Sequence, residues 1–136
     1  TLTKPPLGQR IEILPSFRQW LHELAPHWHE GAMLTIDYGA DSAEAIYDRR
    51  PGGTMRAYHR QQRIEGGGIY ARFGKQDLTS DVNFADLVRW GEELGWETVG
   101  LTTQRDFLLR YGVWTDPVAG EGVGEAFRVL VQRKQG

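Results

Sequence analysis

The stretch Gly31-Ala32-Met33-Leu34-Thr35-Ile36-Asp37-Tyr38-Gly39 decides the fold, because it carries an apolar run that stops abruptly at Asp-Tyr-Gly. The run alternates too weakly for a half-solvated strand and is too short for a helix, so it predicts a central strand covered on both faces. Ligands bind beyond the carboxyl ends of such strands in open α/β sheets. We therefore expect Asp37 and Tyr38 at the mouth of any site. In the alternative interpretation Asp37 only caps the following turn and Gly39 supplies a positive φ.

The composition is that of one globular domain. The chain has 136 residues, of which 40% are hydrophobic, and a net charge of -2 from 16 basic and 18 acidic residues. We therefore expect a buried core, with neither nucleic acid nor a membrane as a partner. The absence of cysteine excludes disulfides, thiolate nucleophiles and cysteine zinc sites. The first residue is Thr1 rather than methionine, which indicates a fragment.

The segment before the central strand predicts a short strand and an amphipathic helix. Residues 10–14 can form the strand, which Pro15 would stop. Ser16 resembles an N-cap, and the apolar spacing predicts a helix from Phe17 to about Ala25.

Histidines between that helix and the central strand suggest a metal hydrolase as an alternative. His27 and His29 form a His-x-His pair beside Glu30, and these residue types bind zinc. They precede the strand, however, whereas α/β sheets bind ligands at the other end. Surface histidines are the simpler interpretation, and no metal is expected.

The remaining sequence predicts an α/β pattern. Ser42 and Thr103 resemble N-caps, Asn83 with Asp86 resembles a capping box, and Gly95 resembles a C′ residue. The expected helices are 43–48, 84–94 and 104–110; the expected strands are 54–58, 96–102 and 126–132, with the final pair antiparallel; the expected loops are 60–68, 77–83 and 116–124. Three long strands make a thin sheet, so we expect a missing N-terminal portion to supply more.

The triple glycine at 66–68 could also cradle a phosphate through its backbone amides. No Gly-Lys-Ser/Thr sequence follows it, so a flexible surface loop is the preferred interpretation.

Several motifs occur together in a characteristic order. They are 10–13 with Pro15 and the Trp20 helix, Ile-Asp-Tyr-Gly at 36–39, Gly-Thr-Met-Arg-Ala-Tyr at 53–58, the segment 76–84, the helix 103–109 with Gly112, and 127–130. In this order and spacing they resemble the MidA-like S-adenosylmethionine-dependent methyltransferases, whose mitochondrial members assist respiratory complex I assembly. The pairing of Gly-Thr-x-Arg-x-Tyr with Asp-Leu-Thr-x-x-Val-x-Phe is the most specific part of the resemblance.

The resemblance implies an α/β fold, namely the C-terminal part of a Rossmann-like class I methyltransferase, with a mixed sheet whose last strand is antiparallel. Residues 1–136 would form the C-terminal portion of one methyltransferase domain. The N-terminal half would carry the glycine-rich turn that binds the cofactor S-adenosylmethionine, so no cofactor-binding residue is assigned here, and the fragment alone is expected to be inactive. By likeness to the family, the methyl acceptor is a protein side chain, with arginine preferred.

The chemistry suggests roles for seven residues. Methyl transfer from a sulfonium needs in-line positioning, and a carboxylate can orient an arginine acceptor and take its proton. Asp37 is therefore the candidate catalytic residue. The candidate substrate-binding residues are Tyr38 in the pocket wall, Asp77, Thr79 and Asp81 along the rim, and Arg56 with Tyr58 in the acceptor channel. The structural alternatives are loop hydrogen bonds for Asp77 and Thr79, an ion pair for Arg56, and a core position for Tyr58.

A different class of function is a non-catalytic interaction module. Five tryptophans and an exposed sheet edge would suit docking to another subunit. The expected partners are thus a protein substrate, a second copy of the chain, or the missing N-terminal half. The expected location is the cytoplasm for a bacterial protein and the mitochondrion for a eukaryotic one.

Overall fold

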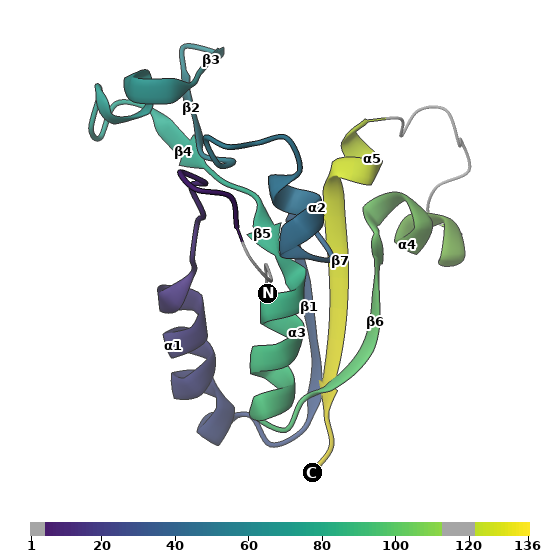
Figure 1. Ribbon diagram of the computed structural model, residues 1–136. Helices are drawn as coiled ribbons and strands as arrows, with labels where there is room; N and C mark the ends of the chain where they lie inside the picture. Colours follow the sequence, from purple (N-terminus) through teal and green to yellow (C-terminus); the bar gives the residue numbers. More distant parts are fainter. Residues whose placement is uncertain (1–4, 113–121) are drawn as a thin grey trace.

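The computed structural model describes residues 5–112 and 122–136, which form a layer of helices against a mixed sheet, with a second, smaller sheet at one end (Figure 1). The helices are α1 (Pro15–Leu24), α2 (Ala43–Tyr47), α3 (Phe84–Glu93), α4 (Gln104–Arg110) and α5 (Val123–Ala126), with 3-10 helices η1 (Ala25–His27) and η2 (Gly66–Tyr70). The strands are β1 (Gly31–Ala40), β2 (Arg56–His59), β3 (Gln62–Ile64), β4 (Asp77–Thr79), β5 (Val82–Asn83), β6 (Glu97–Thr103) and β7 (Phe127–Lys134).

The larger sheet has the strand order β5-β1-β7-β6. Its last strand in sequence, β7, runs antiparallel to both β1 and β6, whereas β5 runs parallel to β1. The expected α/β fold with an antiparallel last strand is therefore confirmed. Because β1 and β6 run the same way, their carboxyl ends lie at one edge of the sheet.

One face of this sheet carries the core. Side chains alternate along β1, and Met33 points toward α1 and α3. The buried cluster consists of Leu21, Met33, Val82, Phe84, Leu87, Trp90, Trp96 and Leu130. The predicted helix 84–94 is confirmed as α3, which buries an apolar stripe of Phe84, Leu87, Trp90 and Gly91.

The opposite face of β1 is not covered within the described residues. The side chains of Leu34 and Ile36 are 51% and 43% exposed. The prediction of a strand covered on both faces is therefore wrong for this chain, because α1 and α3 pack on the Met33 face. In the part of the chain that the structure describes, β1 also lacks a strand partner on the edge away from β7, except where Gly39 and Ala40 meet β5.

The segment before α1 differs from the prediction. Residues 10–14 form no strand, and Pro15 is the first residue of α1 rather than the end of a strand. The residue at the N-cap is Leu14, so Ser16 does not cap the helix. Proline suits the first helical position because its φ is already helical and its missing N–H would have no partner there.

Local capping rules succeed for two other helices and fail for one. Ser42 Oγ accepts the Ala45 N–H at 3.2 Å, and Thr103 Oγ1 accepts the Asp106 N–H at 3.1 Å, as predicted. The predicted capping box at α3 does not form, because Asn83 Nδ2 donates instead to the Asp86 carboxylate at 2.9 Å. Gly95, with φ of +83°, is the C′ residue of α3 as expected.

Three predicted loops contain regular structure. Residues 66–68 begin η2, and the segment 77–83 contains β4 and β5. Strands β3, β2 and β4 form a separate antiparallel sheet, which projects at the top of Figure 1. In the predicted loop 116–124, residues 116–121 lie outside the described residues, and 123–124 begin α5. No helix in the described ranges has the length and apolarity needed to cross a bilayer.

Candidate functional site

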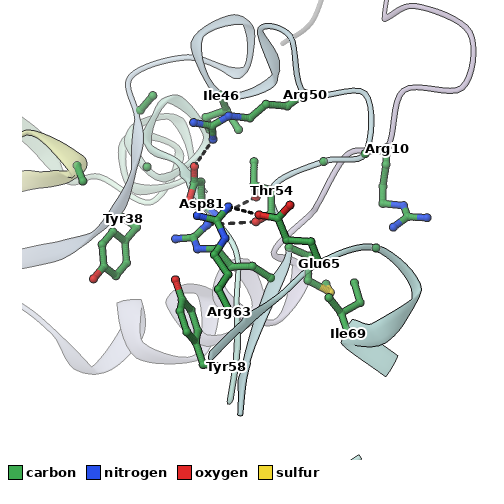
Figure 2. Close-up of a pocket in the computed structure, with 18 of the residues that line it drawn as sticks. Arg10, Tyr38, Ile46, Arg50, Thr54, Tyr58, Arg63, Glu65, Ile69 and Asp81 are labelled. Atoms are coloured by element: carbon green, nitrogen blue, oxygen red, sulfur yellow. Dashed lines mark hydrogen bonds and ion pairs between the residues drawn. The ribbon is translucent and has the colours of Figure 1, made fainter. Parts of the chain in front are cut away.

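A cleft of about 930 Å³ lies at the carboxyl end of β1, between α2 and the smaller sheet (Figure 2). Tyr38, Gly39 and Ala40 line it from β1, and Tyr58 lines it from β2. Ligands of α/β proteins bind at this edge of the sheet. The fold therefore places this cleft at the strand end where the sequence predicts a site.

Tyr38, which lines the cleft, belongs to an aromatic pair and lies beneath a guanidinium. The ring centroids of Tyr38 and Phe127 are 3.9 Å apart, because these residues face each other in the β1–β7 register. The Arg56 guanidinium carbon lies 5.5 Å from the centroid of the Tyr38 ring, within cation–π range. Gly39 allows β1 to approach β5, since a Cβ there would overlap the Val82 carbonyl oxygen.

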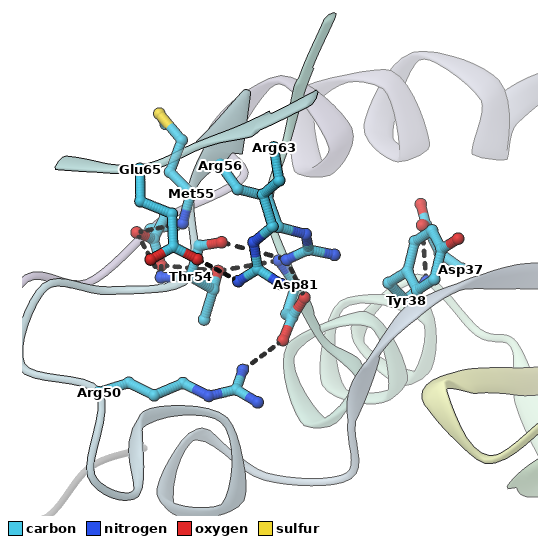
Figure 3. A network of polar contacts seen from close by, with 10 residues as sticks. Asp37, Tyr38, Arg50, Thr54, Met55, Arg56, Arg63, Glu65 and Asp81 are labelled. Atoms are coloured by element: carbon cyan, nitrogen blue, oxygen red, sulfur yellow. Dashed lines mark hydrogen bonds and ion pairs between the residues drawn. The ribbon is translucent and has the colours of Figure 1, made fainter. Parts of the chain in front are cut away.

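Asp81 bridges two arginines in the wall of the cleft (Figure 3). Its carboxylate accepts hydrogen bonds from Arg56 Nη1 and Arg50 Nη1, each at 2.7 Å, and its N–H donates to Thr54 Oγ1 at 2.9 Å. The Arg56 and Asp81 side chains are only 12% and 15% exposed, whereas Arg50 is 52% exposed. Burial by itself lowers the pKa of Arg56, but the hydrogen bond and charge of Asp81 outweigh it and raise that pKa. Arg56 is thus a fixed positive charge.

A second carboxylate, that of Glu12, is held by the turn that precedes β2. It accepts the Thr54 N–H at 3.0 Å and the Thr54 hydroxyl at 3.1 Å. Gly53 fits beside it with φ of +80°, and a Cβ there would overlap the carboxylate. The Tyr47 hydroxyl accepts the Glu12 N–H at 2.8 Å and donates to the Glu12 carbonyl at 3.2 Å. Burial raises the pKa of Tyr47 to about 12.

Sequence reasoning missed Glu12 and Tyr47, which do not line the cleft but hold the segments beside it. Their contacts join residues that are far apart in the sequence. Glu12 contacts Tyr47, 35 positions away, and Thr54, 42 positions away. The motifs at 10–13 and 53–58 contained the partners, but nothing in their spacing indicates that they touch.

Three further arginines line the cleft and were also not singled out from the sequence. They are Arg10, Arg50 and Arg63. Arg63 pairs with Glu65 at 2.6 Å through side chains that are both more than half exposed. Arg10 forms no ion pair with the residues that the structure describes. The sequence feature that could have indicated them is the run of basic residues around β2 and β3.

The structure brings together four of the seven predicted site residues. Tyr38, Arg56, Tyr58 and Asp81 all line the cleft. The ion-pair alternative for Arg56 is confirmed, while the core alternative for Tyr58 is wrong because its side chain is partly exposed.

The other three predicted residues lie elsewhere. Asp37 lines a smaller pocket of about 450 Å³ with Thr35 and Leu87. Its carboxylate accepts the Tyr38 N–H at 2.7 Å. Asp77 and Thr79 belong to β4, where they oppose β2 in register and do not line the cleft. Their roles in substrate binding stay predictions.

The His, Asp and Glu side chains are spread over the structure. Within residues 5–112 and 122–136, no three of them lie together as metal ligands would. His27, His29 and Glu30 are therefore not gathered around one point.

Comparison with known proteins adds a family and a fold. The family model described as "Putative S-adenosyl-L-methionine-dependent methyltransferase" matches residues 2–102. Two solved structures of one superfamily from Burkholderia thailandensis are similar. One is the structure of an uncharacterised protein, which is 24% identical to this chain with a TM-score of 0.70. Its alignment covers 86% of this chain and 36% of the other chain. The other, bound to S-adenosyl-homocysteine, is 23% identical with a TM-score of 0.72, and its alignment covers 88% of this chain and 36% of the other chain.

These structures have the same fold as the chain over the aligned part, and the chain spans about a third of their length. No curated protein matches the chain.

Proposed function

Because the chain belongs to the S-adenosyl-L-methionine-dependent methyltransferase family whose model matches residues 2–102, we propose that it is the C-terminal part of an enzyme that methylates a protein side chain. The match confirms the family resemblance drawn from the sequence. The observation that carries the proposal is the cleft at the carboxyl end of β1, where α/β enzymes bind substrates. The S-adenosyl-homocysteine bound to a protein of similar fold supports S-adenosylmethionine as the methyl donor.

Two finer parts of the proposal come from likeness to the MidA-like family. Arginine is the proposed acceptor, and a role in respiratory complex I assembly is proposed for a mitochondrial parent protein. No individual residue of the cleft supports the arginine acceptor or the role in complex I assembly.

The cleft residues would hold the acceptor protein beside its methylated side chain rather than exchange protons with that side chain. Methyl transfer from a sulfonium depends mainly on in-line alignment. Tyr38 and Tyr58 present partly exposed rings to the cavity, and the Arg56–Asp81 pair makes one wall rigid. Asp37, as the proposed base, would act from the smaller pocket on the opposite face of β1.

We also propose that the rest of the methyltransferase domain completes the larger sheet. In the described residues, positions 31–38 of β1 have a strand partner only on the β7 side. A parallel-sheet strand as apolar as β1 is normally paired on both edges and covered on both faces. The completing part would bind the cofactor, and Leu34 and Ile36 would pack against it.

The test is a calorimetric titration of S-adenosylmethionine into the 136-residue chain and into the longer protein that contains it. We expect binding by the longer protein only, because the family resemblance places the glycine-rich cofactor-binding turn in the N-terminal half of the domain. Mass spectrometry of arginine peptides incubated with the longer protein should then show a mass increase of one methyl group. Failure of the longer protein to bind the cofactor would refute the proposal.

A second candidate function is a non-catalytic interaction module, which the exposed apolar side chains of Leu34 and Ile36 favour. Such a module would bind a partner subunit or form a homodimer through this face. Light scattering distinguishes the two partners, since a homodimer doubles the mass of the pure chain. The interaction module is preferred over the enzyme only when neither the 136-residue chain nor the longer protein binds S-adenosylmethionine.

A further inference from the structure

The charge around the cleft differs in sign from the charge of the rest of the chain. Residues 48–77 contain seven basic and three acidic residues, a net charge of +4, whereas the other 106 residues contain nine basic and fifteen acidic residues. This segment includes β2, β3 and η2, which form the outer wall of the cleft. The chain thus concentrates positive charge at its main cavity although its overall charge is negative.

Three guanidinium groups are available to a ligand at the cleft. Arg10 has no ion-pair partner in the described residues, and Arg50 and Arg63 pair with carboxylates through side chains that are more than half exposed. Ion pairs between exposed side chains contribute little to stability, because water screens them. A ligand carboxylate can therefore replace Glu65 beside Arg63, or share Arg50 with Asp81, at little cost.

The carboxylates of the cleft are not similarly available. Asp81 is largely enclosed and already accepts from two arginines, and Glu65 is paired with Arg63. A cationic side chain entering alone would find these carboxylates occupied and would be repelled by the surrounding guanidinium groups. The cleft is thus suited to an anionic group.

We propose that the cleft binds an acidic peptide segment of the methyl-accepting protein, with Arg10, Arg50 and Arg63 contacting its Asp and Glu side chains. The inference rests on the proposed function, which makes the acceptor a protein. The planar guanidinium fork binds a carboxylate through two parallel hydrogen bonds. Tyr38 and Tyr58 add flat surfaces on which the peptide can lie, on the other side of the cavity from Arg10 in the view of Figure 2.

A nucleic acid is the other polyanion that arginines and aromatic rings bind. It is disfavoured here because the acidic excess outside residues 48–77 would repel a long polyanion, whereas a short acidic peptide fits within the cleft.

The test is fluorescence anisotropy of the full 136-residue chain with two labelled peptides. One peptide has an arginine flanked by glutamates, and the other has glutamines in place of the glutamates. The test variant is Arg10→Gln with Arg63→Gln, which removes two exposed charges and leaves the enclosed Arg56–Asp81 pair intact. The control variant is Arg110→Gln with Arg133→Gln, which makes the same charge change at exposed positions outside the cleft.

We expect the glutamate peptide to bind about tenfold more tightly than the glutamine peptide, and added salt to weaken that difference. The test variant should lose most of the difference, and the control variant should keep it. Equal affinity for the two peptides, or equal losses in both variants, would overturn the proposal. Tighter binding of a single-stranded oligonucleotide of equal charge would assign the cleft to nucleic acid instead.

This assay contains no S-adenosylmethionine, so its failure is distinct from failure of the methyltransferase proposal. A longer protein that binds the cofactor but shows no glutamate preference would keep the proposed function and reject the acidic segment.

Discussion

Replacement of Asp81 by asparagine should destabilise the chain, because it leaves the Arg56 guanidinium enclosed without its counter-charge. Asparagine keeps the side-chain shape and the backbone N–H that donates to Thr54 Oγ1. Removal of one partner costs about 3–5 kcal/mol for a fully buried ion pair and about 0–1 kcal/mol for an exposed one. Arg56 and Asp81 are 12% and 15% exposed, and Arg56 keeps its hydrogen bond to the Thr54 carbonyl. We therefore expect a loss of about 2–3 kcal/mol in the free energy of unfolding.

Urea unfolding followed by tryptophan fluorescence measures this loss. With an m-value of roughly 2 kcal/mol per molar urea, the midpoint should fall by about 1–1.5 M. The matched control is Arg50→Gln, which removes the other hydrogen bond to Asp81. Because the Arg50 side chain is 52% exposed, this change should cost less than about 1 kcal/mol.

A double variant separates an unpaired charge from general disruption of the wall. Arg56→Met removes the enclosed positive charge, so combining it with Asp81→Asn should cost less than the sum of the two single changes. A cost for Asp81→Asn no larger than that for Arg50→Gln would refute the reasoning, as would strict additivity in the double variant.

Three further predictions concern other parts of the fold. The pKa of Tyr47 is raised from 10.0 to about 12, so the unfolded chain loses this proton first. Its contribution to stability is complete below pH 10 and is lost as pH rises through 12. Urea midpoints of the natural chain and Tyr47→Phe over that range should differ in slope, and parallel curves would contradict the assignment. Gly39→Ala should cost about 1–3 kcal/mol because the new Cβ overlaps the Val82 carbonyl, whereas Gly100→Ala, with nothing within 4 Å of its Cβ, should be nearly neutral in the same assay. Leu34→Ala should cost less than about 1 kcal/mol and Leu21→Ala about 2–5 kcal/mol, because Leu34 is half exposed and Leu21 is buried; equal costs would mean that Leu34 is covered in solution.

The elements that the sequence predicted well are those governed by local rules. The apolar alternation of β7, the stripe of α3 and the hydroxyl caps at Ser42 and Thr103 depend on residues within one or two turns of the chain. The failed caps show the limit of such rules. Asn83 has a suitable side chain, yet it donates to the Asp86 carboxylate rather than accepting a backbone N–H.

The site was predicted only in part, because its geometry depends on contacts that are distant in sequence. Tyr38, Arg56, Tyr58 and Asp81 come together because β1, β2 and the segment before β5 meet at one edge of the sheet. The Glu12 carboxylate holds residues 10–14 against the turn before β2, which explains why this segment is irregular rather than a strand. An alternating apolar pattern cannot distinguish an irregular segment from a strand.

The apolar run of β1 was interpreted as burial on both faces for a sound physical reason, but a sequence does not say which molecule covers a face. Met33 meets α1 and α3, whereas Leu34 and Ile36 remain exposed in the described residues. If the rest of the methyltransferase domain covers that face, the same residues that appear unfavourable here become part of its core.

The positions of Asp37 and Tyr38 connect the two proposals. Consecutive residues of a strand point to opposite faces, so Tyr38 faces the arginine-lined cleft while Asp37 faces the smaller pocket. An acidic peptide held in the cleft would therefore have to pass the carboxyl end of β1 to present its arginine to Asp37, because the completing part of the domain is proposed to pair with the edge of β1 that lacks a strand partner within the described residues. The completing part of the domain would add at this same edge and bring the methyl donor with it. We thus expect Asp37→Asn to reduce methyl transfer by the longer protein without weakening the binding of the glutamate peptide. The reason is that the proposed base, Asp37, and the cleft that holds the peptide lie on different faces of β1.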